Sequence, residues 1–211
     1  MKNHPRPDRL RDTYDRIAED WARDHEADTW WLEGTARFAS LLPPDARVLD
    51  AGCGSGQKAK FFQDRGARVI GIDFSEKLLE IARQTATVAD FRLLDLRDIR
   101  TLSEEFDGVF AQASLLHIPK TEAFSVIEGM VSRLVPRGLL YIAVKAQRPE
   151  YPEEEVVTEN DYGYTYDRFF SYFTIDELRA HLDRLGLSVV HAEASQAPSK
   201  GNWIQIIARQ P

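Results

Sequence analysis

The chain has 211 residues, 43% of them hydrophobic and 29% charged, and its 34 Asp and Glu against 27 Lys and Arg give a formal net charge of −7. This is the composition of a soluble globular protein, and an acidic chain without a Lys/Arg cluster argues against nucleic acid as a partner. A single cysteine, Cys53, excludes an internal disulfide framework. Because the N-terminus lacks a signal-like apolar region and no apolar run is long enough to span a bilayer, we expect a cytoplasmic protein without a membrane partner.

The beginning of the chain predicts two helices. Apolar residues recur at helical spacing from Leu10 to Trp21. A second helix is expected from Thr29 to Leu42, where a Pro-Pro-Asp break follows. We therefore assign residues 1–42 to an N-terminal helical cap.

After the break, short β-rich runs alternate with helical stretches, in the order RVLDA, KAKFFQDRG, RVIGID, SEKLLEIARQ and DFRLLD. This alternation predicts βαβαβ units and a parallel sheet with right-handed crossovers. It continues through FDGVFAQA, a helix over 122–134 and LLYIAVK, whose apolar strands suit a sheet covered on both faces. We assign residues 45–145 to a doubly wound core.

The last third of the chain begins with an interruption at residues 147–172, where an acidic run precedes the aromatic-rich DYGYTYDRFFSYF. Long irregular segments in compact domains are often functional, so we expect a lid or substrate insert there. Thr174 and Glu177 then form a T-x-x-E capping box that predicts a helix. LSVVHA and NWIQIIARQ follow as two strands, so 173–211 is assigned to a C-terminal helix and strand pair of the same single domain.

Three glycines at alternate positions, Gly52, Gly54 and Gly56, follow the first expected parallel strand. Glycine lets a ligand approach the backbone, and the following helix N-terminus attracts negative charge. A ligand is therefore expected at this switch point of the sheet. The dinucleotide fingerprint G-x-G-x-x-G would need glycine at Gln57, which argues against a pyrophosphate ligand.

Three carboxylates, Asp50, Asp73 and Asp95, end three successive strands. A carboxylate such as Asp73 can accept hydrogen bonds from both hydroxyls of a ribose, and Asp95 can accept one from an exocyclic amine. Each of them could instead cap a helix or form a turn. Their common register with the glycine loop favours contact with a ligand.

These segments together resemble the class I S-adenosylmethionine-dependent methyltransferases, in particular small bacterial members that act on small molecules. DAGCGSG is similar to that family's glycine-rich motif and GIDFSEKLL to its ribose motif, while DLRDI resembles its adenine segment and FDGVFAQASLLHIP its fourth-strand motif. The resemblance extends from about residue 45 to 145. It implies a Rossmann-like, seven-stranded, mostly parallel sheet whose last strand is antiparallel, with N-terminal helices and a lid insert.

The resemblance also implies a cofactor, S-adenosylmethionine, and the residues that hold it. The glycine loop would bind the methionine end, Asp73 the ribose and Phe74 the adenine ring. Asp95 and Leu96 would bracket the adenine edge, and the floor near the sulfonium would face the substrate. The complete expected cofactor set is Asp50, Ala51, Gly52, Cys53, Gly54, Gly56, Asp73, Phe74, Ser75, Leu78, Asp95, Leu96, Gln112 and Ala113.

Methyl transfer from a sulfonium is an in-line displacement that depends on positioning and exclusion of water. A hydroxyl or thiol acceptor also needs a base, for which His117 is the candidate; it could instead cap a helix or be a loop residue. Tyr14, assigned to the catalytic set, and Trp21 are expected to fold over the cofactor, or else merely dock their helix on the sheet. Four residues are expected to form an aromatic wall of the substrate site: Tyr164, Tyr166, Phe170 and Phe173.

Several residues have simpler explanations. Cys53 between glycines suits packing in a tight turn, and Trp30, Trp31 and Trp203 suit the core. The four other histidines show no metal-ligand spacing, so no metal is expected; they are His4, His25, His181 and His191.

We therefore expect S-adenosylmethionine-dependent methyl transfer to a small-molecule acceptor, with the acceptor atom and the oligomeric state open. Methyltransferases that act on DNA-base amines resemble one another in an Asn/Asp-Pro-Pro-Tyr/Phe run, where this chain has Gln112-Ala113-Ser114-Leu115. The alternatives are methylation of a protein or RNA, or a non-catalytic S-adenosylmethionine-binding module. A nicotinamide reductase is the third alternative, and Gln57 in place of the fingerprint glycine argues against it.

Overall fold

A computed structural model describes residues 7–197 and 201–211. The expected N-terminal cap is thus described from Pro7 onward, whereas residues 1–6, with His4, lie outside the described residues. None of the helices in the described ranges combines the length and the apolar character that crossing a membrane requires.

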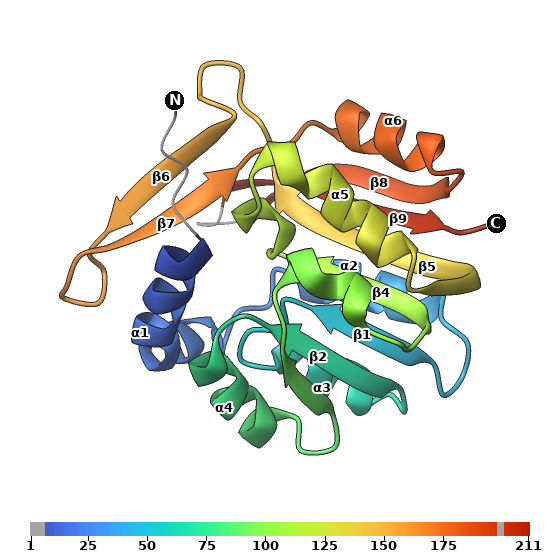
Figure 1. The fold of residues 1–211 in the computed structure, drawn as a ribbon, viewed down its shortest axis with the longest axis horizontal. Helices are drawn as coiled ribbons and strands as arrows, with labels where there is room; N and C mark the ends of the chain where they lie inside the picture. The colour runs from blue at the N-terminus through green and yellow to red at the C-terminus, as the bar shows by residue number, and fades with distance from the viewer. Residues whose placement is uncertain (1–6, 198–200) are drawn as a thin grey trace.

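Seven strands form one sheet in the order β3-β2-β1-β4-β5-β9-β8 (Figure 1). β1 to β5 pair in parallel, and β9 is antiparallel to both β5 and β8. This confirms the predicted Rossmann-like, mostly parallel sheet with an antiparallel last strand. The strands are β1 (Arg47–Ala51), β2 (Arg68–Asp73), β3 (Asp90–Leu93), β4 (Phe106–Gln112), β5 (Leu134–Lys145), β8 (Ser188–Ala197) and β9 (Gly201–Arg209).

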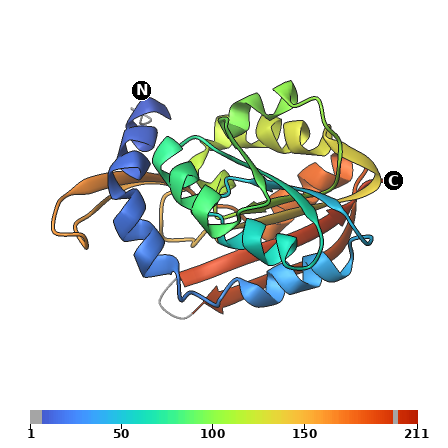
Figure 2. The same cartoon turned by 90° about the horizontal axis from the view of Figure 1, so that it is seen from below.

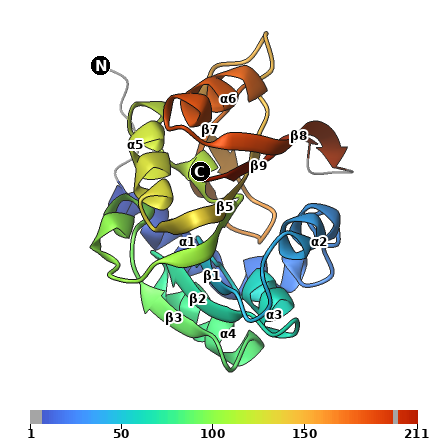
Figure 3. The same ribbon diagram turned by 90° about the vertical axis from the view of Figure 1, so that its right-hand side faces the viewer.

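Helices cover both faces of the sheet (Figure 3). One core layer packs α5, α6 and the short helix η1 against the sheet, and the other packs α2, α3 and α4. In β4, Val109 contributes to the first layer and the neighbouring Phe110 to the second, as the alternation of side chains along a buried strand requires. The helices are α1 (Pro7–His25), α2 (Leu32–Ser40), α3 (Gln57–Gln63), α4 (Glu76–Thr85), η1 (Leu96–Thr101), η2 (Leu115–His117), α5 (Lys120–Val131) and α6 (Ile175–Arg184).

Helix ends follow local signals where the sequence carries a cap. Thr174 and Glu177 form the predicted capping box at the start of α6. At the start of α4, the Oγ of Ser75 accepts a hydrogen bond from the backbone N–H of Leu78. The expected helix over 122–134 ends earlier, at Val131, because the chain has entered β5 by residue 134.

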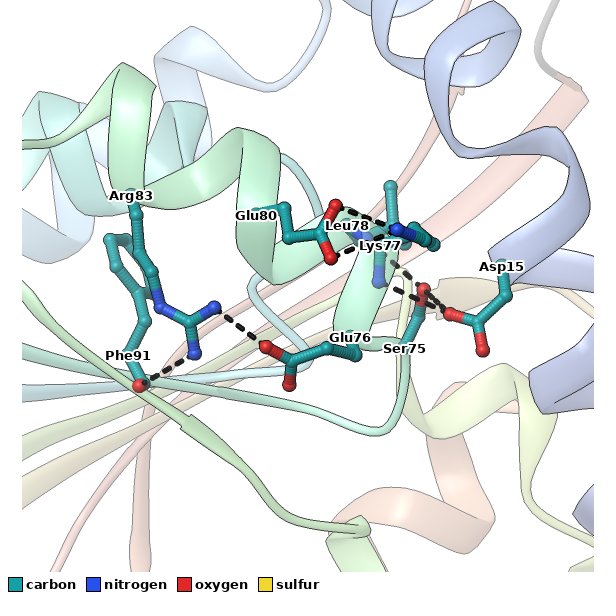
Figure 4. A network of polar contacts seen from close by, with 8 residues as sticks. All are labelled: Asp15, Ser75, Glu76, Lys77, Leu78, Glu80, Arg83 and Phe91. Carbon is teal, nitrogen blue, oxygen red and sulfur yellow. Dashed lines mark hydrogen bonds and ion pairs between the residues drawn. The ribbon is translucent and has the colours of Figure 1, made fainter.

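α1 is fixed to α4 by one carboxylate. Oδ1 of Asp15 accepts hydrogen bonds from the Oγ of Ser75 at 2.6 Å and from the backbone N–H of Lys77 at 3.2 Å (Figure 4). The backbone N–H of Lys77 lies in the first turn of α4, where N–H groups have no acceptor within the helix, and Asp15 supplies that acceptor. The contact holds the predicted N-terminal cap over the carboxyl edge of the sheet.

The insert at 147–172 is not irregular, and that part of the sequence prediction is wrong. β6 (Glu154–Glu159) and β7 (Tyr166–Ser171) pair as an antiparallel hairpin outside the main sheet. The aromatic and β-branched residues of this segment suit a strand more than a loop. The hairpin extends beside α1, as Figures 1 and 2 show, and the Oγ1 of Thr13 donates to the carbonyl of Asp167 at 3.1 Å.

Candidate active site

A cavity of about 570 Å³ opens at the carboxyl ends of the parallel strands, between them and α1 with the β6–β7 hairpin. This is the edge at which open α/β sheets bind ligands, and the volume suits a cofactor or a small molecule. Fifteen of the residues predicted for the site line it: Tyr14, Trp21, Asp50, Gly52, Cys53, Gly54, Asp73, Phe74, Leu78, Asp95, Leu96, Gln112, Ala113, His117 and Phe170.

The glycine loop adopts a backbone that side chains would obstruct. Gly52 has a φ of +82°, and a Cβ there would lie 2.2 Å from the Cβ of Ser114. Gly54 has a φ of +53°, and a Cβ there would lie 3.4 Å from the Trp21 ring. Glycine is therefore required at Gly52 both by conformation and by space, and at Gly54 mainly by conformation. The loop backbone is left accessible to the cavity.

Asp73 holds this loop in place. Its Oδ2 accepts a hydrogen bond from the N–H of Gly54 at 2.9 Å, and its Oδ1 accepts one from the N–H of Ser75 at 2.9 Å. Burial of the carboxyl raises its pKa to about 6, against the lowering effect of these backbone hydrogen bonds. Asp73 therefore shapes the loop as well as lining the cavity.

Asp50 and Gln112, at the floor of the cavity, carry buried polar atoms without a hydrogen bond in the described part of the chain. Oδ2 of Asp50 and both the Oε1 and the Nε2 of Gln112 are buried without a hydrogen bond there. Burial also raises the pKa of Asp50 to about 7. Buried polar atoms cost free energy unless they are paired, so these two side chains fit a polar ligand. Next to them Ala113 has a φ of +57°, an uncommon backbone conformation that turns the chain at the end of β4.

Asp95 lines the cavity and also caps the short helix η1. Its Oδ1 accepts from the N–H of Arg97 at 2.9 Å and caps η1, and the Nη1 of Arg97 lies 3.2 Å from both of its oxygens. Leu96, next in the chain, is buried. The carboxylate therefore keeps a structural cap even if it also meets a ligand.

Tyr14 and His117 meet across the cavity, in a hydrogen bond of 2.7 Å between Oη and Nε2. On the other side of the imidazole, Nδ1 lies 2.7 Å from the carbonyl oxygen of Phe169. Because that carbonyl only accepts, Nδ1 carries the hydrogen, and Nε2 of the neutral ring accepts from the tyrosine hydroxyl.

The electrostatics of this pair favour the neutral forms. Burial, together with the cations Arg168 and Lys145, lowers the pKa of His117 to about 3, against the raising effect of the hydrogen bond to the Phe169 carbonyl. Burial raises the pKa of Tyr14, while the guanidinium of Arg168 opposes that rise. At neutral pH the pair thus presents an uncharged imidazole and an uncharged phenol to the cavity.

Of the four residues predicted for the aromatic wall, Phe170 lines the cavity and three do not: Tyr164, Tyr166 and Phe173. Phe173 is fully buried in the core, and its N–H donates to the carbonyl of Lys145. Tyr164 lies on the outer side, where its hydroxyl donates to Asp20 at 3.1 Å and the guanidinium of Arg16 lies over its ring. Tyr164 precedes β7 and Phe173 follows it, so the strand that carries Phe170 to the cavity positions neither of them.

Three of the predicted cofactor residues support the site from behind the cavity wall. The carbonyl of Ala51 accepts from the Oγ of Ser114 at 2.7 Å. Gly56, with a φ of +83°, precedes α3, and Ser75 caps α4. Each shapes the backbone that the cavity residues depend on.

The sequence interpretation missed Lys145 and Arg168, which line the cavity, and it assigned Trp30 and Trp203 to the core alone. Trp203 is buried in the core and also lines the cavity, as does Trp30. Lys145 ends an apolar strand at the ligand-binding edge of the sheet, a signal that could have identified it. Arg168 carried no such signal, because the hairpin was expected to be irregular.

Comparison with known proteins agrees with this geometry. The methyltransferase domain family matches residues 48–138. The chain is 30% identical over 188 residues to 27-O-demethylrifamycin SV methyltransferase of Amycolatopsis mediterranei, covering 83% of this chain and 66% of that protein. It is 32% identical over 116 residues to a ubiquinone biosynthesis O-methyltransferase of Xanthomonas axonopodis, covering 53% of this chain and 48% of that protein. The chain thus spans about half the length of several curated relatives that it matches.

Among solved structures, the fold is similar to that of Burkholderia thailandensis 1,6-didemethyltoxoflavin-N1-methyltransferase, which was crystallised with 1,6-didemethyltoxoflavin and S-adenosylhomocysteine. The TM-score is 0.77 at 20% identity, over 100% of this chain and 91% of that one. Residues 48–138 thus match the methyltransferase domain family, and the chain has the fold found in S-adenosylmethionine-dependent methyltransferases.

Proposed function

We propose that the chain transfers the methyl group of S-adenosylmethionine to a small-molecule acceptor. The observation that carries this proposal is the set of unpartnered buried atoms on two side chains, Oδ2 of Asp50 and the amide of Gln112, beside a glycine loop at the carboxyl edge of the sheet. S-adenosylmethionine supplies an electrophilic methyl group on a positively charged sulfur. Its amine, hydroxyl and ring-nitrogen groups are the partners that such side chains need.

The residues of the cavity have distinct proposed tasks in holding the cofactor. The backbone of Gly52 and Gly54, with Asp50, would bind its methionine end. Asp73 would orient the ribose, and Phe74 would pack on the adenine. Gln112 and Ala113 would border the reacting sulfur, facing the acceptor.

An enclosed acceptor site favours a small molecule over a protein or an RNA. α1 and the β6–β7 hairpin cover the cavity, and Tyr14, Trp21 and Phe170 give it aromatic walls that exclude water. Similarity to methyltransferases of rifamycin, of ubiquinone biosynthesis and of a toxoflavin precursor supports the same conclusion. The single free cysteine, buried at Cys53, is consistent with the proposed cytoplasmic location.

Tyr14 and His117 are the proposed catalytic pair for an acceptor that loses a proton. Nε2 of His117 already accepts a hydrogen from Tyr14, so a proton leaving the acceptor can pass to the tyrosine oxygen as the tyrosine proton passes to the imidazole. The carbonyl of Phe169 fixes the imidazole in the tautomer that this relay needs.

Calorimetric titration with S-adenosylmethionine and with S-adenosylhomocysteine tests the cofactor assignment, with NADH as the control ligand. We expect dissociation constants in the micromolar range. Gln112→Met removes two unpaired polar atoms without breaking a hydrogen bond of the described structure, and should weaken binding about tenfold. Gln84→Met, on the exposed face of α4, is the matched control and should leave binding unchanged.

Release of S-adenosylhomocysteine in the presence of candidate acceptors then tests catalysis. Turnover with a small molecule would support the methyltransferase proposal. Cofactor binding without turnover on any acceptor would support the non-catalytic binding module instead. Absence of binding, or tighter binding of NADH, would contradict the cofactor assignment.

A further inference from the structure

Lys145 lies on the acceptor side of the cavity. It is the last residue of β5, and the sheet order β1-β4-β5 separates it from the glycine loop by strand β4. It pairs across the sheet with Trp203 of β9, so the two side chains share one face. Both line the cavity, together with His117. The cation is thus placed where an acceptor, rather than the methionine end of the cofactor, would meet it.

This cation lacks an ion-pair partner among the described carboxylates, unlike two other cations that line the cavity. Arg97 pairs with Asp95 and Glu122, and Arg168 pairs with Glu159 through two hydrogen bonds of 2.5 and 2.6 Å. Lys145 instead has its ammonium 4.3 Å from the centroid of the Phe170 ring. A half-buried ammonium of this kind is stabilised when an anionic oxygen completes its hydrogen bonds.

Flat aromatic side chains line the same cavity as the ammonium. The Phe170 ring contacts both Lys145 and Arg168, and the guanidinium of Arg168 is 5.1 Å from its centroid. Trp30 and Trp203, with ring centroids 4.5 Å apart, form another wall. Such walls favour a planar ring by stacking or edge contacts, and they exclude water from the charged pair.

We propose that the acceptor is a planar, aromatic molecule that carries a carboxylate, and that Lys145 is the specificity-determining residue that binds this carboxylate. This inference rests on the proposed function and names the substrate class of the same site. A bound carboxylate would also offset one of the two cations near His117, and so make the imidazole a better proton acceptor during transfer.

The test uses the protein saturated with S-adenosylhomocysteine and titrates it with paired probes: benzoate and benzamide, 4-hydroxybenzoate and 4-hydroxybenzamide, and 1-naphthoate and 1-naphthamide. Each pair differs mainly in charge. We expect at least one carboxylate to bind about ten- to hundredfold more tightly than its amide. Lys145→Met should reduce that ratio to about one, while Lys145→Arg should retain most of it.

Lys60→Met, on the exposed part of α3, is the control and should keep the preference. Equal binding of carboxylates and amides, or no binding of any probe to a protein that binds S-adenosylhomocysteine, would overturn the inference and leave the proposed function standing. A carboxylate preference that survives in Lys145→Met would also overturn it. Loss of S-adenosylhomocysteine binding in Lys145→Met, with retained binding in Lys145→Arg, would assign the residue to the cofactor and overturn it as well.

Discussion

Tyr14 and His117 are 103 positions apart in the chain, yet the tyrosine hydroxyl donates to Nε2 of the imidazole over 2.7 Å. The contact joins α1 to the segment that follows β4. It brings together the two residues that the sequence analysis assigned to catalysis. Because the carbonyl of Phe169 accepts the hydrogen on Nδ1, the imidazole is fixed in the tautomer whose Nε2 accepts from the tyrosine hydroxyl.

Removing either member of this pair should slow methyl transfer to an acceptor that must lose a proton. We expect Tyr14→Phe and His117→Ala to lower kcat by about 10²- to 10⁴-fold, the usual contribution of general base catalysis. The affinity for S-adenosylhomocysteine should change far less in Tyr14→Phe, which removes only the hydroxyl. Steady-state kinetics and calorimetry provide the two readouts. Tyr151→Phe, outside the cavity, is the control, and a similar kcat in all variants would refute the relay.

The buried carboxyl of Asp50 should make stability depend on pH. Burial raises its pKa to about 7, so the folded chain holds this proton more tightly than the unfolded chain does. The stabilisation that this proton provides is therefore fully present below about pH 4, and it is lost as the pH rises through about 7.

Urea unfolding of the ligand-free protein at a series of pH values measures this effect. Between about pH 4 and pH 8 the free energy of unfolding should fall in both proteins. The decrease should be smaller in Asp50→Asn than in the wild type, by roughly 1–4 kcal/mol. Asp64→Asn, which alters an exposed pair with Lys60, should follow the wild-type curve. Parallel curves for Asp50→Asn and the wild type would show that Asp50 does not titrate in this range.

Asp15→Ala should loosen α1 over the cavity. The variant loses the hydrogen bonds from Ser75 and Lys77 shown in Figure 4, which together should cost about 1–2 kcal/mol. Hydrogen exchange should accelerate in α1 more than in β1 or β4. Glu80→Ala removes only an exposed pair with Lys77 and should change little. Equal exchange in α1 of the two variants would contradict the role of Asp15.

Phe173→Leu should act on stability and not on the site. This side chain is fully buried outside the cavity, so we expect a loss of about 1–2 kcal/mol in unfolding free energy with unchanged S-adenosylhomocysteine binding. Phe170→Leu, which alters the cavity wall, is the comparison and should weaken binding of the aromatic carboxylates. If Phe173→Leu changed the affinity for the probes more than Phe170→Leu does, Phe173 would have to be assigned to the cavity wall after all.

The sequence was sufficient wherever the information is local or repeats along the chain. Alternating apolar runs predict a parallel sheet, and parallel strands bring their carboxyl ends to one edge. Asp50, Asp73 and Gln112 could therefore be assigned to a common site without knowledge of any long-range contact. The glycine loop and the capping box at Thr174 were predictable for the same reason, since each depends on a few neighbouring residues.

Only the tertiary structure decided what covers that edge and which side chains face it. The position of α1, held by Asp15 on Ser75, brings Tyr14 to His117, and no local pattern encodes a contact across 60 or 103 positions. The pairing of β6 with β7 decides that Phe170 faces the cavity, whereas Phe173 lies in the core beyond the end of β7. The end of an apolar strand places Lys145 at the ligand-binding edge of the sheet, but it does not show that the side chain enters the cavity. Folding leaves it half-buried beside the Phe170 ring, and so makes it a candidate for recognising charge.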